Sequence, residues 1–179
     1  TAYLKENPDL MANPVAVINP GVGFKTKQWD LARFAQLADR IAGDFGYNIL
    51  LAWGPGEENK IKFIASRMTR RHWIAPPTSV HQSIALFRNI SLFISCDTGP
   101  LHLCSVMGIP TVSIFGPTDP VRNGPFGTNH EVVFKKQTCS FCYKRQCPLN
   151  NECMDEVTVE DVFQAVKKSI SNHVKILAD

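Results

Sequence analysis

Short apolar runs alternate with helix-like segments along most of this 179-residue chain, and glycine or proline stands at many of the junctions. The runs Val15–Asn19 and Ser91–Ser95 have the length and the β-branched or aromatic content of buried strands. Between the runs, apolar residues recur with helical spacing, as they do from Leu31 to Ile41. Parallel strands need long crossover connections, which are usually helices. The chain is therefore predicted to be a Rossmann-like α/β domain with a parallel sheet flanked by helices.

Turn and capping residues set the expected boundaries. Strands are expected at residues 15–19, 47–53, 73–75, 91–95, 111–115 and 131–134. Helices are expected to begin after Asp30, at Glu57, after Thr78 or Ser79, at Pro100 and after Thr158. We expect residues 1–179 to form one domain, in which residues 1–13 are a linker segment.

Composition excludes several classes of protein. Hydrophobic residues make up 44% of the chain, which is too much for intrinsic disorder, and no apolar run is long enough to cross a bilayer. The 19 Lys and Arg against 16 Asp and Glu give a net charge of +3, less than a nucleic-acid-binding face requires. Residues 1–13 are polar and mixed, unlike a secretory signal. We therefore expect a cytoplasmic protein that binds no nucleic acid.

Ligands of such sheets bind beyond the carboxyl ends of the strands, so the loops that follow strands are the places to search for a site. One of them, Cys96–Pro100, leads from a strand directly into a helix. The Thr98 and Gly99 amides and the positive end of that helix can hold an anion. The Asp97 carboxylate can accept a hydrogen bond from a sugar hydroxyl, and His102 follows one turn later on the same side. The alternative is that Asp97 only caps the helix.

Two other loops carry charged candidates. Lys27 follows the first strand and can neutralise a phosphate as a point charge, although Lys25 competes for that role and a single lysine is commonly just solvated. Glu57 or Glu58, after the second strand, can bind ribose hydroxyls or can simply favour the positive end of a helix. No G-x-G-x-x-G opens the first helix and no G-x-x-x-x-G-K-[ST] occurs, so ordinary NAD and P-loop sites are excluded.

A rigid turn, Gly116–Pro120, ends another predicted strand. Its Thr118 and Asp119 can face a ligand. Taken alone, however, the turn is better explained as a simple change of chain direction.

Four cysteines are close together in the sequence at positions 139, 142, 147 and 153. The first interval fits a four-thiolate zinc site well, and the later intervals fit it less well. The alternative, which is slightly favoured, is a set of reduced thiols that pack an irregular loop. We therefore expect no metal and no cofactor.

Together these motifs resemble the C-terminal half of the ADP-heptose:lipopolysaccharide heptosyltransferases of glycosyltransferase family 9. The resemblance runs from about Val15 to the last helix and is most specific in Asp97-Thr-Gly-Pro-x-His102 followed by Gly116-Pro-Thr-Asp-Pro120. It also includes Asn19-Pro-Gly21, Lys27-Gln-Trp29, Trp53-Gly54 with Glu57-Glu58, and Gly108-Ile-Pro-Thr111. For a large subset of the family it further includes the segment that carries the four cysteines, residues 139–153, which we call the cysteine loop.

The resemblance implies one half of a GT-B glycosyltransferase, in which this domain binds the nucleotide-sugar donor. The other, N-terminal domain receives the acceptor and supplies the catalytic base, so no catalytic residue is expected in this chain and the isolated chain is expected to be inactive. The donor contacts implied are Lys27 to the diphosphate, Thr98 and Gly99 to phosphate, Asp97 to the sugar, and Glu58 or its neighbour Glu57 to the ribose.

The implied reaction moves heptose from ADP-heptose to a lipopolysaccharide inner-core acceptor with inversion. An acceptor hydroxyl, deprotonated by a carboxylate, attacks the anomeric carbon and ADP leaves. The ligand loops contain no Asp-x-Asp motif, which agrees with metal-independent transfer. An acceptor of this kind implies peripheral association with the inner face of the inner membrane. Two alternatives stay open: a regulatory nucleotide-binding module without chemistry, and a sugar-nucleotide epimerase of GT-B type.

Overall fold

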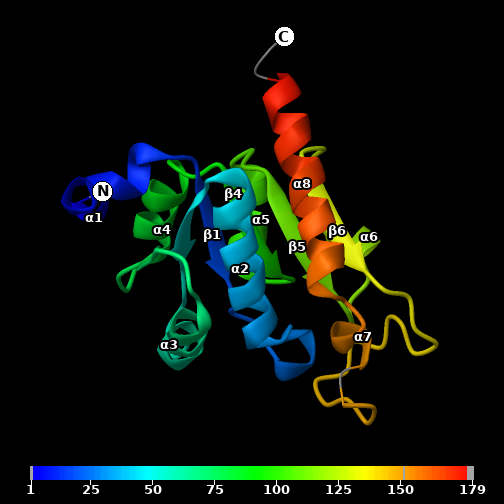
Figure 1. Cartoon of the computed structure of the whole chain (residues 1–179). Coiled ribbons are helices and arrows are strands. Elements are labelled where there is room, and N and C mark those ends of the chain that lie inside the picture. The colour runs from blue at the N-terminus through cyan, green and yellow to red at the C-terminus, as the bar shows by residue number, and fades with distance from the viewer. Residues whose placement is uncertain (1, 151, 177–179) are drawn as a thin grey trace.

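The computed structural model describes residues 2–150 and 152–176, and a six-stranded sheet forms its centre (Figure 1). The strand order is β3-β2-β1-β4-β5-β6, and every neighbouring pair is parallel. The strands are β1 (Val15–Asn19), β2 (Asn48–Leu51), β3 (His72–Ile74), β4 (Leu92–Cys96), β5 (Thr111–Phe115) and β6 (His130–Phe134). The predicted Rossmann-like parallel sheet is confirmed.

Helices cover both faces of the sheet, which is why every residue of β1, β4 and β5 is buried. In Figure 1, α2 and α8 lie in front of the sheet. One apolar core unites α2 (Leu31–Phe45), α3 (Glu58–Arg67) and α8 (Val159–Ile176) with the strands. A second core lies under α4 (Val80–Phe87) and α5 (Gly99–Val106). In the described residues, none of the helices combines the length and the apolarity that crossing a membrane requires.

The predicted capping residues act as expected. The Asp30 side chain accepts a hydrogen bond from the backbone of Arg33 at the start of α2, and Gly46 ends that helix with a φ of 68°. Ser79 and Gln82 form a reciprocal capping box at α4. These local signals explain why the predicted helix boundaries lie close to the observed ones.

The N-terminal segment is folded onto the domain. It contains α1 (Ala2–Glu6) and the 3-10 helix η1 (Pro8–Ala12). Leu10 is fully buried in the second core, and the Tyr3 hydroxyl donates to the Ile74 carbonyl at 2.9 Å. The role of residues 1–13 as a linker between domains stays a prediction, and residue 1 lies outside the described residues.

Trp29 fixes the long loop that leaves β1. Its side chain is fully buried, its indole N–H donates to the Val157 carbonyl at 2.8 Å, and its ring meets Phe34 edge-on at 4.9 Å. Just before it, the short 3-10 helix η2 (Lys25–Lys27) carries the two candidate lysines. Burial of Trp29 therefore holds these lysines above the carboxyl end of the sheet.

Candidate donor-binding site

The order of the strands reverses between β1 and β4, and such a switch point is where open α/β sheets bind ligands. Lys27, after β1, reaches across this point to Asp97, after β4, with 2.6 Å between Lys27 Nζ and Asp97 Oδ2. Both side chains are shielded, at 13% and 7% exposure. A shielded pair of this kind needs good geometry and further hydrogen bonds to offset its loss of hydration.

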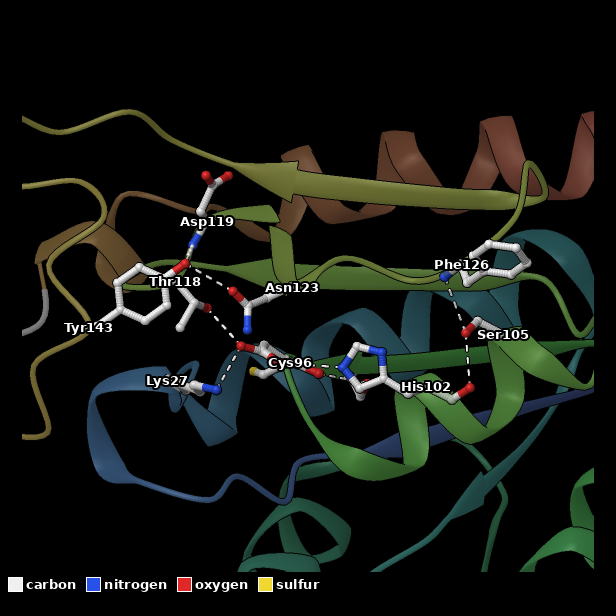
Figure 2. Close-up of polar contacts among 11 residues, drawn as sticks. Lys27, Cys96, His102, Ser105, Thr118, Asp119, Asn123, Phe126 and Tyr143 are labelled. Atoms are coloured by element: carbon white, nitrogen blue, oxygen red, sulfur yellow. Dashed lines mark hydrogen bonds and ion pairs between the residues drawn. The ribbon is translucent and has the colours of Figure 1, made fainter. Parts of the chain in front are cut away.

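Two more side chains approach the same carboxylate (Figure 2). The Thr118 hydroxyl donates to Asp97 Oδ2 at 2.7 Å, and His102 Nε2 lies 3.8 Å from Asp97 Oδ1. The N-cap residue of α5 is Thr98, and the Asp97 carboxylate accepts from Lys27 and Thr118 instead of from the helix backbone, so the interpretation of Asp97 as only a helix cap is wrong. Three candidate residues from three segments, Lys27, His102 and Thr118, thus surround the charge of the fourth, Asp97.

Beside this cluster lies a cavity of about 320 Å³, lined by residues that follow β1, β2, β3 and β4. Glu57, Trp53, Thr98 and Asn19 are among them. Asn19 is 4% exposed, and its Oδ1 atom has no hydrogen-bond partner. That oxygen is itself buried behind the cavity wall, so it is a polar atom beside the site and not a ligand contact.

The structure separates the two neighbouring glutamates. The Glu57 carboxylate accepts from the Val22 amide at 3.2 Å and from the Gly54 amide at 3.0 Å, and so ties two ligand loops together. Gly21 lies against it, and a Cβ at that position would overlap the carboxylate and push the Glu57 side chain aside. Glu58 points elsewhere: it is exposed and pairs with Lys62 at 2.9 Å. Of the two, only Glu57 lines the cavity.

Thr118 and Asp119 also behave differently from each other. Thr118 is 2% exposed and faces Asp97, whereas the Asp119 side chain accepts from the Val121 amide and caps α6 (Pro120–Asn123). The Tyr143 hydroxyl lies 3.2 Å from the Asp119 amide and holds the cysteine loop to this turn (Figure 2). Direct contact of Asp119 with a donor stays a prediction.

The cysteine loop contains no metal-binding group in the described part of the chain: no three His, Cys, Asp or Glu side chains there are placed to hold an ion. Cys153 is a buried residue of the short helix α7 (Glu152–Asp155), while Cys139 is exposed. Burial, together with the smaller repulsion from the other three thiolates, raises the pKa of the Cys153 thiol to about 11. The four thiols therefore lie near one another without forming a coordination shell.

Thiol alkylation at pH 8 is expected to distinguish these cysteines. Burial raises the pKa of Cys96 to about 12 and also raises that of Cys104. A thiol with a pKa near 11 is only about one-thousandth thiolate at pH 8, and thiolate is the reactive form. Iodoacetamide labelling followed by mass spectrometry should modify Cys139 at least about 100-fold faster than Cys96, Cys104 or Cys153. If all four cysteines of the cysteine loop instead resisted alkylation, and a chelator made them reactive, the zinc alternative would be supported.

Sequence reasoning missed two contributors to this site. Asn19 was included only in a motif, and its orphaned oxygen becomes visible only when β1 is placed between β2 and β4. Gly21 was included only in the same motif, and its close approach to Glu57 depends on a contact between two loops. Their place in the sequence could have identified them, because Asn19 ends the first strand and Gly21 follows it.

The fold and these loops define a class: a Rossmann-like domain of the GT-B type with its polar groups gathered at the switch point. The model of glycosyltransferase family 9 (heptosyltransferase) matches residues 2–152, and the chain belongs to this family. Lipooligosaccharide heptosyltransferase 2 of Campylobacter jejuni is 29% identical over 184 residues, covering 91% of this chain and 54% of that protein. The chain thus spans about half the length of such relatives.

Solved structures agree with this family. The E. coli heptosyltransferase WaaC with ADP is 26% identical, with a TM-score of 0.71 over 88% of this chain and 45% of that one. A structure of WaaC with ADP-2-deoxy-2-fluoro heptose is 25% identical, with a TM-score of 0.68 over 88% and 44%. A family 9 glycosyl transferase from Veillonella parvula has a TM-score of 0.82 at 21% identity, covering 96% and 50%.

Proposed function

We propose that this chain is the donor-binding domain of a glycosyltransferase that moves heptose from ADP-heptose to a lipopolysaccharide inner-core acceptor, with inversion and without a metal ion. The observation that carries the proposal is the Lys27–Asp97 pair at the switch point, next to the first turn of α5. The family membership and the ADP in the WaaC structure support a nucleotide-sugar donor.

The diphosphate is proposed to lie between Lys27 and the first turn of α5. An ammonium group has three donors, so Lys27 can keep its bond to Asp97 and still donate to a phosphate oxygen. The amides of Thr98 and Gly99 and the positive end of α5 add partial charge on the other side. As the sugar departs, negative charge grows on the diphosphate, and groups that are already in place stabilise it without reorganising.

The adenosine is proposed to fill the cavity that Trp53 and Glu57 line. Glu57 already accepts two backbone hydrogen bonds, and a carboxylate has further acceptor sites for ribose hydroxyls. Asp97 Oδ1, the oxygen that makes no bond to Lys27 or Thr118, is left to accept from the transferred sugar.

The catalytic base and most of the acceptor site are assigned to an N-terminal domain, so this chain alone should transfer nothing. The complete enzyme would work in the cytoplasm, at the inner face of the inner membrane. Isothermal titration of this chain with ADP, UDP and GDP tests the donor assignment, and ADP should bind tightest. Absence of ADP binding would contradict that assignment. Turnover by this chain with any acceptor would overturn the division of the site between two domains. Epimerisation of an ADP-sugar without acceptor would favour the epimerase alternative.

Asp97→Asn is expected to lower kcat/KM for the nucleotide sugar about tenfold in an enzyme that contains both domains, because the sugar loses a charged acceptor. The melting temperature should also fall, since Lys27 is shielded and loses its counter-charge. Thr118→Val is the matched control: it removes the other hydrogen bond to the same carboxylate and keeps the charge. An Asp97→Asn enzyme with unchanged kcat/KM would remove Asp97 from the donor site.

A further inference from the structure

A second polar cavity, of about 410 Å³, lies between η2 and the cysteine loop. It is lined by Lys25, Thr26, Arg145, Gln146, Cys147 and Asn150. The two segments are fastened together, because the Thr26 hydroxyl donates to the Lys144 carbonyl at 2.7 Å. The volume falls within the range of small-molecule sites.

The charged residues that line this cavity have one sign. Of the described residues, those that line it include two cations and no carboxylate. In the sequence Lys144 precedes Arg145 and adds a third positive charge to this loop, whereas Lys135 is paired with Asp161. A concave surface lined by one sign of charge focuses the field and concentrates ions of the opposite sign. The amide side chains of Gln146 and Asn150 add groups that pair with sugar hydroxyls.

The cavity adjoins the phosphate end of the proposed donor site. Lys27 Nζ lies 4.5 Å and Arg145 Cζ 5.9 Å from the centre of the Phe24 ring, so one ring connects the two sites. The adenosine cavity shares no lining residue with this one. A ligand held here therefore lies near the sugar that is transferred, where an acceptor must be.

We propose that this cavity binds an acidic group, phosphate or carboxylate, on the acceptor saccharide. Arg145 pairs with the acidic group, since its planar guanidinium donates two parallel hydrogen bonds to either anion. Gln146 and Asn150 contact neighbouring hydroxyls. The donor-binding domain thereby contributes to acceptor selection, an inference that rests on the proposed function for the identity of the ligand as acceptor.

The test is an NMR titration of the 179-residue chain with glucose 6-phosphate, glucuronate, glucose and inorganic phosphate, each with and without saturating ADP. The two acidic sugars should shift the signals of Arg145, Gln146 and Asn150 whether or not ADP is present, and glucose should not. Arg145→Gln should weaken the binding of the acidic sugars about tenfold, as loss of one charge-assisted contact predicts. Lys136→Gln removes an equal charge from an exposed residue of the same segment outside the cavity and should leave binding unchanged.

Each other outcome is decisive. Displacement of the acidic sugars by ADP would show that they occupy the diphosphate site and would overturn the proposal, as would equal effects of Arg145→Gln and Lys136→Gln. If inorganic phosphate bound as tightly as the acidic sugars, the proposal that the cavity recognises a saccharide would be overturned. Failure of ADP to bind, with acidic-sugar binding intact, would refute the proposed function and leave an anionic-sugar site. A preference for glucose 6-phosphate or for glucuronate identifies the acidic group.

Discussion

Trp29→Ala is expected to lower the free energy of unfolding by about 3–5 kcal/mol, the usual cost of removing a large buried aromatic side chain. The mutation leaves a cavity in the main core, removes the edge-on contact with Phe34 and leaves the Val157 carbonyl without its indole donor. For a domain of this size the melting temperature should fall by about 10 °C. Urea unfolding followed by circular dichroism measures the change.

Trp73→Ala is the matched control. Trp73 lies on the edge strand β3, is only half-buried and has the Arg71 guanidinium 4.6 Å above its ring. Removing the Trp73 side chain should lower the free energy of unfolding clearly less than removing that of Trp29, because less apolar surface returns to water. If the two substitutions proved equally costly, Trp29 would not be the anchor of the loop that carries Lys27.

Lys27→Ala is expected to weaken ADP binding between about 10-fold and 150-fold, which corresponds to a loss of roughly 1.5–3 kcal/mol from one charge-assisted contact. Adenosine lacks the phosphates, so its affinity should change less than about twofold. Asp97 adds to the effect, because without Lys27 its charge repels the diphosphate. Isothermal titration with ADP and adenosine gives both numbers.

Lys25→Ala provides the comparison within the same 3-10 helix. Lys25 lines the second cavity rather than the one assigned to adenosine, so its removal should alter ADP affinity much less. A larger loss of ADP binding in Lys25→Ala than in Lys27→Ala would transfer the phosphate contact to Lys25. Equal losses of ADP and adenosine binding in Lys27→Ala would instead indicate a structural role for that lysine.

Most of the fold could be predicted from sequence because its signals are local. Buried strands such as β1 and β4 read as continuous apolar runs, and Asp30, Ser79 and Gly46 mark helix ends through bonds to nearby backbone. The packed N-terminal segment was not predicted. Its anchor, Leu10, is a single apolar residue in a polar stretch, and its burial depends on contact with distant strands.

The site was predictable only as a set of loops. Strand ends indicated Lys27, Asp97 and Thr118, but not that Lys27 and Thr118 both bond to the Asp97 carboxylate, because those contacts join residues 70 and 21 positions apart. The sequence also left Glu57 and Glu58 equivalent, since adjacent residues on a helix start differ only in direction. The structure shows which side chain points into the site, because only the Glu57 carboxylate bonds to the two neighbouring loops.

The central claim is that the switch point between β1 and β4 holds the nucleotide diphosphate, and a crystal structure of this chain with ADP tests it most directly. We expect the diphosphate between Lys27 Nζ and the first turn of α5, with the adenosine in the cavity lined by Trp53 and Glu57. ADP bound elsewhere, or with its phosphates directed away from Lys27 and Gly99, would contradict it.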